Sequence, residues 1–172
     1  NARLMGFSAA PTPADLREIV GFARAGGVRP RLSCVLLEGE VDCLPKLLDY
    51  LDFARSVGSD NVIFRQLMKT DSRAHAANAV VRFSDARRAR LETLLDAVSA
   101  DPSFEFQRQI VGYYYYVEVW RRGGIDVVFE EADLARLEKT KRLMPGVVHE
   151  LVFHPDGKLA STWQPWDGVL GP

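Results

Sequence analysis

The sequence predicts an α/β protein, and two contrasting patterns support this prediction. Between Arg31 and Met68, a helix-period stretch separates two apolar runs, which is the pattern of a parallel strand–helix–strand unit. From Phe104 onwards, aromatic and β-branched runs alternate with turn residues, as in antiparallel hairpins. Parallel strands therefore come first, and a parallel sheet needs cover on both of its faces.

Local signals predict the first helix and the first strand. The segment Pro13 to Ala25 carries apolar residues at helical spacing, with Thr12 as N-cap and proline at the first helical position. Gly26 and Gly27 end this helix. The continuous apolar run from Arg31 to Leu37 is typical of a buried strand.

The parallel unit continues with a helix from about Asp42 to Val57 and a strand from Val62 to Leu67. Residues 69–81 are polar and rich in small side chains, so we expect a loop there. A loop that directly follows a parallel strand is a common place for a ligand site. Ser84 is expected to cap the next helix, from about Asp85 to Ser99.

Hairpins and one further helix are expected in the remainder of the chain. The run Tyr113 to Trp120 and the run Ile125 to Phe129 flank a turn with the sequence RRGG. A helix is expected over Glu131 to Leu143. Two last strands, Val148 to His154 and Lys158 to Trp163, flank a Pro-Asp-Gly turn.

Composition excludes several classes of partner. The 172 residues carry a formal net charge of −1, so no strong field attracts nucleic acid or an anionic membrane. No apolar run approaches the roughly 20 residues that span a bilayer. The two cysteines favour a reducing compartment over a disulfide scaffold, so we expect a cytoplasmic protein.

No complete catalytic motif is present in the sequence, and there is no P-loop, HExxH, GxGxxG or GxSxG. Cys34 and Cys43 are interpreted as a core residue and a helix-start residue, in preference to a metal pair. The three histidines are far apart in sequence, and a solvated imidazole is the expectation for His154 at its turn. We therefore expect no metal ligands in this chain.

Arg65 and Gln66 are polar residues near the end of a strand that otherwise reads as buried. A buried arginine needs a partner, and the C-terminal ends of parallel strands are where α/β barrels place their active sites. Ser33, on the neighbouring strand, could point to the same interior. Two interpretations of Arg65 remain open: contact with a ligand, or an internal salt bridge.

The same segments carry a family resemblance. The run SCVLLEG, the helix ending in FARSVG and the run NVIFRQLM resemble the fifth and sixth strands of radical S-adenosylmethionine enzymes. The most similar branch is the one around the molybdenum-cofactor biosynthesis protein A. The opening NARLMGF and the helix ending in ARAGG are similar to the stretch after that family's fourth strand, so the resemblance covers about residues 1 to 70.

The resemblance implies the C-terminal part of a partial (β/α)₆ TIM-type barrel in residues 1–70, followed by an α+β region in residues 71–172 on the substrate side. In this family a CxxxCxxC loop binds a [4Fe–4S] cluster that cleaves S-adenosylmethionine to a 5′-deoxyadenosyl radical. Ser33, Arg65, Gln66 and Leu67 occupy positions that the resemblance assigns to cofactor binding. The chain departs from the family pattern at Ser33 and at Arg65-Gln66, and the cysteine motif is absent, so this chain alone has no cluster ligands.

Two functional hypotheses follow. In the first, the chain is the C-terminal portion of a radical S-adenosylmethionine enzyme that abstracts hydrogen from an unknown small-molecule substrate. Asp71, Arg73 and Asn78, beyond the second strand, are then the candidate substrate-binding residues. In the alternative, the chain is a non-catalytic α+β binding or assembly module. A fragment of a barrel would expose the edge of its Arg31–Leu37 strand, so we also expect an edge-paired or swapped oligomer, or cover by residues 1–12.

Overall fold

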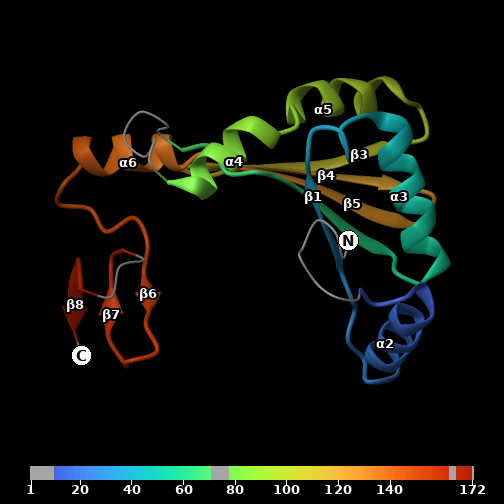
Figure 1. Cartoon of the computed structure of the whole chain (residues 1–172), viewed down its shortest axis with the longest axis horizontal. Helices are drawn as coiled ribbons and strands as arrows, with labels where there is room; N and C mark the ends of the chain where they lie inside the picture. Colours follow the sequence, from blue (N-terminus) through green and yellow to red (C-terminus); the bar gives the residue numbers. More distant parts are fainter. Residues whose placement is uncertain (1–9, 71–77, 163–165, 172) are drawn as a thin grey trace. The chain divides into compact units, whose positions relative to one another are not determined.

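The computed structural model describes residues 10–70, 78–162 and 166–171 (Figure 1). The chain divides into two compact units, Asn1–Asp133 and Leu134–Pro172. The sequence-based division fell near residue 70. The structure divides the chain later because the strand that ends at Ala132 pairs with the strand that ends at Gln66.

The first unit alternates helices and strands before it turns to consecutive strands. Its described elements, in chain order, are α2 (Pro13–Ala25), β1 (Leu32–Leu36), α3 (Leu44–Ser56), β2 (Asn61–Gln66), α4 (Ala79–Arg87), α5 (Leu91–Ala100), β3 (Glu105–Val111), β4 (Tyr115–Arg122) and β5 (Ile125–Ala132). α2 begins with a complete capping box, in which the Thr12 side chain accepts from Asp15 N and the Asp15 carboxylate accepts from Thr12 N. The expected bounds of this helix are confirmed.

These five strands form one mixed sheet in the order β1-β2-β5-β4-β3. β1 pairs with β2 and β2 with β5 in parallel, whereas the β4–β5 and β3–β4 pairs are antiparallel. The mixed α/β architecture is therefore confirmed. The sheet is open, and the described strands form no barrel, because the antiparallel β4 and β3 extend the sheet beyond β5 instead of closing it.

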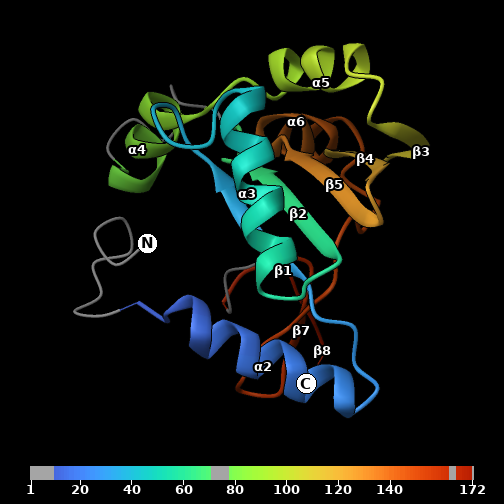
Figure 2. The same cartoon turned by 90° about the vertical axis from the view of Figure 1, so that its right-hand side faces the viewer.

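α3 and α5 cover one face of this sheet, and Figure 2 shows α3 crossing in front of β1 and β2. The two helices contribute Leu47, Leu51, Ala54, Leu91, Leu94 and Val98 to the main core. Phe64 and Phe129 lie at the centre of this core on β2 and β5, with their rings stacked 5.6 Å apart and no exposed surface. Burying aromatic rings in register across two parallel strands joins the strand–helix–strand unit to the later hairpin.

The opposite face of the sheet carries a second apolar cluster. Ile63, Val119 and Val128 are buried there with Val117 packed against them, and all four lie on strands. By register, Ser33, Arg65 and Glu130 share this face. We call it the strand-only face, because the apolar cluster on it draws its described members from strands alone.

The segment after β2 differs from the sequence-based expectation. α4 begins at Ala79, within the stretch that was expected to be a loop, because the Asn78 side chain accepts from Val80 N and Val81 N and so caps the helix. Ser84 lies inside α4 and donates to the carbonyl of Met68, so its expected role as a helix cap is wrong. The chain leaves helical geometry at Arg88 and resumes it in α5.

The second unit contains α6 (Leu134–Leu143) and an antiparallel sheet of β6 (Val152–Phe153), β7 (Leu159–Ala160) and β8 (Val169–Gly171). The expected turn between β6 and β7 is present, with Gly157 at a φ of 88°. His154 is buried, and its Nε2 lies 3.2 Å from the Thr162 carbonyl, so the expected solvated imidazole is wrong. No helix in the described parts of the chain is both long enough and apolar enough to cross a membrane.

Candidate functional site

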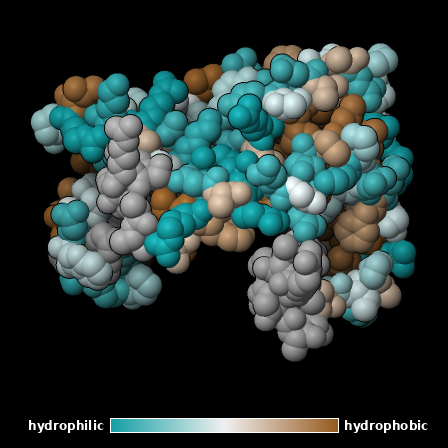
Figure 3. Space-filling model, turned by 45° about the horizontal axis from the view of Figure 1, so that its top comes forward, coloured by the Kyte–Doolittle hydropathy of each residue, from teal (hydrophilic) through white to brown (hydrophobic). Residues whose placement is uncertain are grey.

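A polar groove lies beside the C-terminal end of β2, where the first unit brings the β2 end, α4 and the start of α5 together. One part of the groove has a volume of about 420 Å³ and is lined by Gln66, Lys69, Asp85, Arg88, Ala89, Arg90, Glu92 and Thr93. A second part of about 570 Å³ shares most of these residues and adds Glu38, Asp42 and Cys43 from the loop after β1. Figure 3, which brings α4 and α5 towards the reader, shows mainly hydrophilic side chains across the middle of this face.

Gln66 is the buried polar side chain of the groove. It is 6% exposed, and its Nε2 donates to the Ala89 carbonyl at 2.8 Å. Its Oε1 is buried and accepts no hydrogen bond from the described residues. A buried acceptor without a donor costs about 1–3 kcal/mol, so this amide oxygen destabilises the first unit by that order of magnitude.

Lys69 joins the groove to the end of β5. Its Nζ contacts the Glu131 carboxylate closely and lies 3.5 Å from Glu92 Oε1. Although burial alone would lower it, these two carboxylates raise the pKa of Lys69, so the ammonium form is held. The charge of Lys69 is therefore already balanced within the protein.

Arg88 fixes the chain that leaves β2. Its Nε donates to the Leu67 carbonyl at 3.0 Å, and its Nη2 donates to the Met68 carbonyl at 2.9 Å. The same Nη2 lies 2.7 Å from Asp85 Oδ1. The guanidinium thereby satisfies backbone acceptors just beyond a strand end, which holds one wall of the groove in place.

The residues expected to bind a cofactor do not all share one face. Ser33 and Arg65 lie on the strand-only face of β1 and β2, and Arg65 is two register positions beyond the residue paired with Ser33. Gln66 points to the opposite face, where α3 and α5 pack. Arg65 Nη2 lies 3.5 Å from Glu130 Oε2, so the internal ion pair considered for Arg65 is present, although half of the Arg65 side chain remains exposed.

The remaining expected residues have different surroundings. Leu67 directly follows β2, and its carbonyl accepts from Arg88. Asn78 caps α4, and its side-chain oxygen already accepts hydrogen bonds from two backbone N–H groups of that helix. Asp71 and Arg73 lie outside the described residues.

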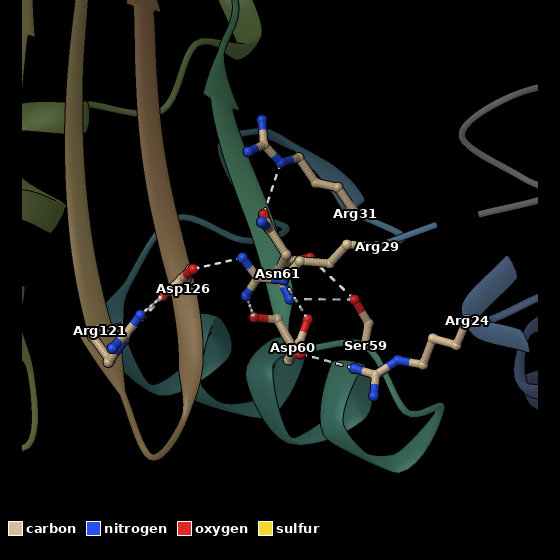
Figure 4. Close-up of polar contacts among 8 residues, drawn as sticks. All are labelled: Arg24, Arg29, Arg31, Ser59, Asp60, Asn61, Arg121 and Asp126. Atoms are coloured by element: carbon tan, nitrogen blue, oxygen red, sulfur yellow. Dashed lines mark hydrogen bonds and ion pairs between the residues drawn. The ribbon is translucent and has the colours of Figure 1, made fainter. Parts of the chain in front are cut away.

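A separate network of charges lies at the other end of the parallel strands (Figure 4). Asp60 contacts Arg24 of α2 at 2.9 Å and Arg29 at 3.0 Å. Asp126 contacts Arg29 and Arg121, each at 2.8 Å. Because each aspartate is matched by arginines and the N-terminal ends of parallel strands seldom hold active sites, we interpret this network as a structural connection.

Neither cysteine has the surroundings of a metal ligand. Cys34 lies in the main core, and burial raises the pKa of its thiol to about 12. Cys43 is exposed at the start of α3. Within the described residues, no group of three or more His, Cys, Asp or Glu side chains is arranged to hold a metal ion.

Sequence reasoning missed Lys69, Arg90 and Glu92 as groove residues. The charged residues between Asp85 and Glu92 were interpreted as the mixed surface of one helix. In the structure that helix is interrupted at Arg88, which forms an isolated bridge with Leu37. The interruption therefore lies beside the ends of β1 and β2. Periodicity gives no local signal of the interruption, because the buried positions of both helices follow one continuous helical period: Val81 and Ser84 in α4, and Leu91, Leu94 and Val98 in α5.

Comparison of the chain with protein-family models, with curated proteins and with solved structures finds no significant match. Any assignment of function therefore depends on the geometry of this chain and on the resemblance of its first 70 residues.

Proposed function

We propose that this chain is the C-terminal portion of a radical S-adenosylmethionine enzyme and contributes binding surface for the nucleoside part of that cofactor. The observation that supports this proposal is the placement of Ser33 and Arg65. They lie two register positions apart on adjacent parallel strands, on the face away from α3 and α5. In a barrel whose helices lie outside, this strand-only face corresponds to the interior, and active sites lie at the C-terminal ends of the strands, where Arg65 is placed on β2.

The side chains on this face suit a polar ligand. The Ser33 hydroxyl can both donate and accept a hydrogen bond, which matches a ribose hydroxyl. Arg65 offers donors to ring nitrogens or carboxylate oxygens, and Glu130 orients its guanidinium from β5. Ser33 and Arg65 thus bind and orient the ligand in this proposal, and neither moves a proton.

The [4Fe–4S] cluster does not fit the residues of this chain. Its attachment in this family needs three thiolates, and the chain has two cysteines, of which Cys34 is buried as a neutral thiol. When bound, the cluster supplies the electron that cleaves S-adenosylmethionine. We therefore assign its ligands to a part of the enzyme outside these 172 residues.

A decisive test is the gene sequence upstream of the codon for Asn1. A CxxxCxxC motif in the same reading frame supports the proposal, and a start codon directly before Asn1 contradicts it. The complete gene product, purified without oxygen, should then bind iron and sulfide and release 5′-deoxyadenosine from S-adenosylmethionine. Arg65→Gln should weaken cofactor binding, whereas Arg108→Gln, on the exposed edge strand β3, should not.

One observation favours the alternative, a non-catalytic α+β binding or assembly module. Arg65 already has a protein partner in Glu130, as that alternative requires. If Arg65 serves only this ion pair, Arg65→Gln lowers stability and leaves the affinity for S-adenosylmethionine unchanged. Measuring unfolding and binding on the same variant separates the two functions.

A further inference from the structure

The strand β3 forms one edge of the five-stranded sheet (Figure 2). Among the described strands it pairs only with β4. All seven of its residues, Glu105–Val111, are exposed. Such an edge carries a row of backbone N–H and C=O groups that can pair with another strand, so proteins usually protect it. β3 therefore offers a surface to which a further strand can be added.

A bulge brings two opposite charges onto one face of this edge, because the register with β4 shifts between Phe106 and Arg108. Without such a shift, residues three apart on a strand lie on opposite faces of the sheet. Glu105 lies opposite Arg121 of β4. Arg108 lies opposite Val119, which shares a face with Arg121 because the two are two positions apart on β4. Glu105 and Arg108 therefore share the strand-only face.

These two charges are not matched by the described residues. The Glu105 carboxylate and the Arg108 guanidinium form no hydrogen bond or ion pair in the described part of the chain. Arg121 on the neighbouring strand, in contrast, pairs with Asp126 at 2.8 Å. Charges on an edge strand repel most incoming strands, but a strand that carries the opposite charges in the matching order is attracted. The edge thus selects its partner by charge.

We propose that β3 pairs antiparallel with β3 of a second copy of this chain, so that two sheets join into one across a two-fold axis. With the axis between Phe106 and Gln107, position 105 of each copy lies opposite position 108 of the other. Each Glu105 then meets Arg108 of the other copy on the strand-only face, and the symmetry repeats this contact. A second copy fits this edge because its own sequence supplies both complementary charges.

The same arrangement covers an exposed aromatic ring. Phe106 is 49% exposed, and its ring packs edge-on against Trp120 with the centroids 5.1 Å apart. Near the two-fold axis, Phe106 lies opposite Gln107 of the other copy and diagonal to the other Phe106. Aromatic side chains in opposite and diagonal positions stabilise strand pairs, so Phe106 adds apolar burial to the backbone hydrogen bonds and the ion pairs.

The proposed interface is short, so we expect a reversible dimer. Stable interfaces bury roughly 800 Å² on each partner, and pairing of about six residues along an edge buries less. We therefore expect a dissociation constant in the micromolar range, about 1–100 µM.

The opposite edge of the sheet lacks this complementarity. The sequence predicted an oligomer through the edge of the Arg31–Leu37 strand, but β1 contains no charged residue that would specify a partner. β5 and β4 separate β3 from β2 in the sheet. Dimerisation through β3 therefore does not use Arg65 or the proposed nucleoside surface, and the two proposals can fail separately.

The first test is sedimentation velocity of the full chain over a range of concentrations. We expect the weight-average sedimentation coefficient to rise from that of a monomer towards that of a dimer between about 1 and 300 µM. High salt should weaken the dimer, because its ion pairs lie at an exposed edge. A chain that stays monomeric throughout this range overturns the proposal.

Charge reversal tests the register of the two strands. Arg108→Glu places acid opposite acid at both contacts, and Glu105→Arg places arginine opposite arginine. Each variant alone should therefore dimerise at least about tenfold more weakly than the unchanged chain. An equimolar mixture of the two variants restores opposite charges at both contacts, so it should form a heterodimer within about threefold of the original affinity.

Lys139→Glu on α6 is the matched control, since it makes the same change of charge as Arg108→Glu at an exposed residue outside β3. It should leave dimerisation unchanged. All three substituted residues are exposed, so circular dichroism should show the same fold in every variant. If the two β3 variants each dimerise as well as the unchanged chain, or if their mixture stays monomeric, the proposed pairing is overturned.

Discussion

Arg29 Nη1 lies 2.8 Å from Asp126 Oδ2, although the two residues are 97 positions apart in the chain. Arg29 precedes β1, and Asp126 is at the beginning of β5, so one ion pair connects the first and last strands of the parallel part of the sheet. The same guanidinium also reaches Asp60 before β2. The two contacts of Arg29 hold the segment between α2 and β1 against the N-terminal ends of β2 and β5.

The first prediction concerns this network and pH. Burial would raise the pKa of Asp126, but its contacts with Arg121 and Arg29 lower it below the usual value. The pair therefore contributes stability above the unfolded-state pKa near 4, and this contribution is lost as pH falls through the lower folded-state value. We expect Asp126→Asn to cost about 1 kcal/mol at pH 7 and much less in acid, measured by urea unfolding at both pH values.

Asp52→Asn is the matched control for that measurement. Asp52 pairs with Arg55 at 3.6 Å, and both side chains are more than half exposed. We expect no measurable change in the free energy of unfolding, because exposed pairs at this separation contribute little. An equal loss for Asp126→Asn at neutral and acid pH would mean that charge pairing is not its cause.

The second prediction concerns the main core. Phe64 has no exposed surface and stacks on Phe129, so Phe64→Ala should lower the free energy of unfolding by about 3–5 kcal/mol. Phe22 on α2 is 84% exposed, and Phe22→Ala should change stability by less than about 0.5 kcal/mol. Chemical unfolding followed by circular dichroism measures both. Similar losses for the two variants would contradict the burial that the structure assigns to Phe64.

The third prediction concerns the turn between β4 and β5. Gly123 and Gly124 have φ values of 52° and 83°, as a two-residue hairpin turn requires. A Cβ at Gly124 meets no atom within 4 Å, so Gly124→Ala tests backbone conformation alone. We expect a loss of about 1 kcal/mol in thermal or urea unfolding.

Gly146 provides the control for the turn. A Cβ there also meets nothing within 4 Å, and Gly146 is not among the residues with positive φ. Gly146→Ala should therefore leave stability unchanged or raise it slightly. A destabilisation of Gly146→Ala as large as that of Gly124→Ala would show that the loss at Gly124 does not come from its φ value.

The fourth prediction concerns the two thiols. Cys34 is buried, and burial raises its pKa to about 12, so its thiol stays protonated and shielded at pH 8. Cys43 is exposed. Iodoacetamide should label Cys43 in the folded protein and reach Cys34 only after denaturation, as peptide mass spectrometry can measure. Labelling of Cys34 at the rate of Cys43 under native conditions would contradict the core position of β1.

Elements with their own start and stop signals could be predicted from the sequence. The capping residue Thr12, the following proline and the glycines after Ala25 define α2 without help from the rest of the chain. The apolar runs around Cys34 and Phe64 likewise predicted a parallel pair of strands, and β1 and β2 form it. These signals act within about one turn or one strand of the residues that carry them.

Elements and contacts that depend on distant partners could not be predicted in this way. Every residue of β3 is exposed, so no buried period marks it as a strand, and its pairing with β4 decides its conformation. The groove was missed for the same reason, because the contact between Gln66 and Ala89 joins residues 23 positions apart. The division at Asp133 also depends on pairing, since it follows from the register between β2 and β5.

The sequence by itself determined the helix α2, the parallel strand–helix–strand unit and the glycine turns, because capping, periodicity and backbone freedom are local properties of the chain. The tertiary structure alone decided that the sheet stays open, that Arg65 and Gln66 lie on opposite faces of it, and that the start of α5 borders a polar groove at the end of β2. The physical reason is that strand order and side-chain burial are set by which segments pair, and that choice depends on the free energy of the whole packed unit.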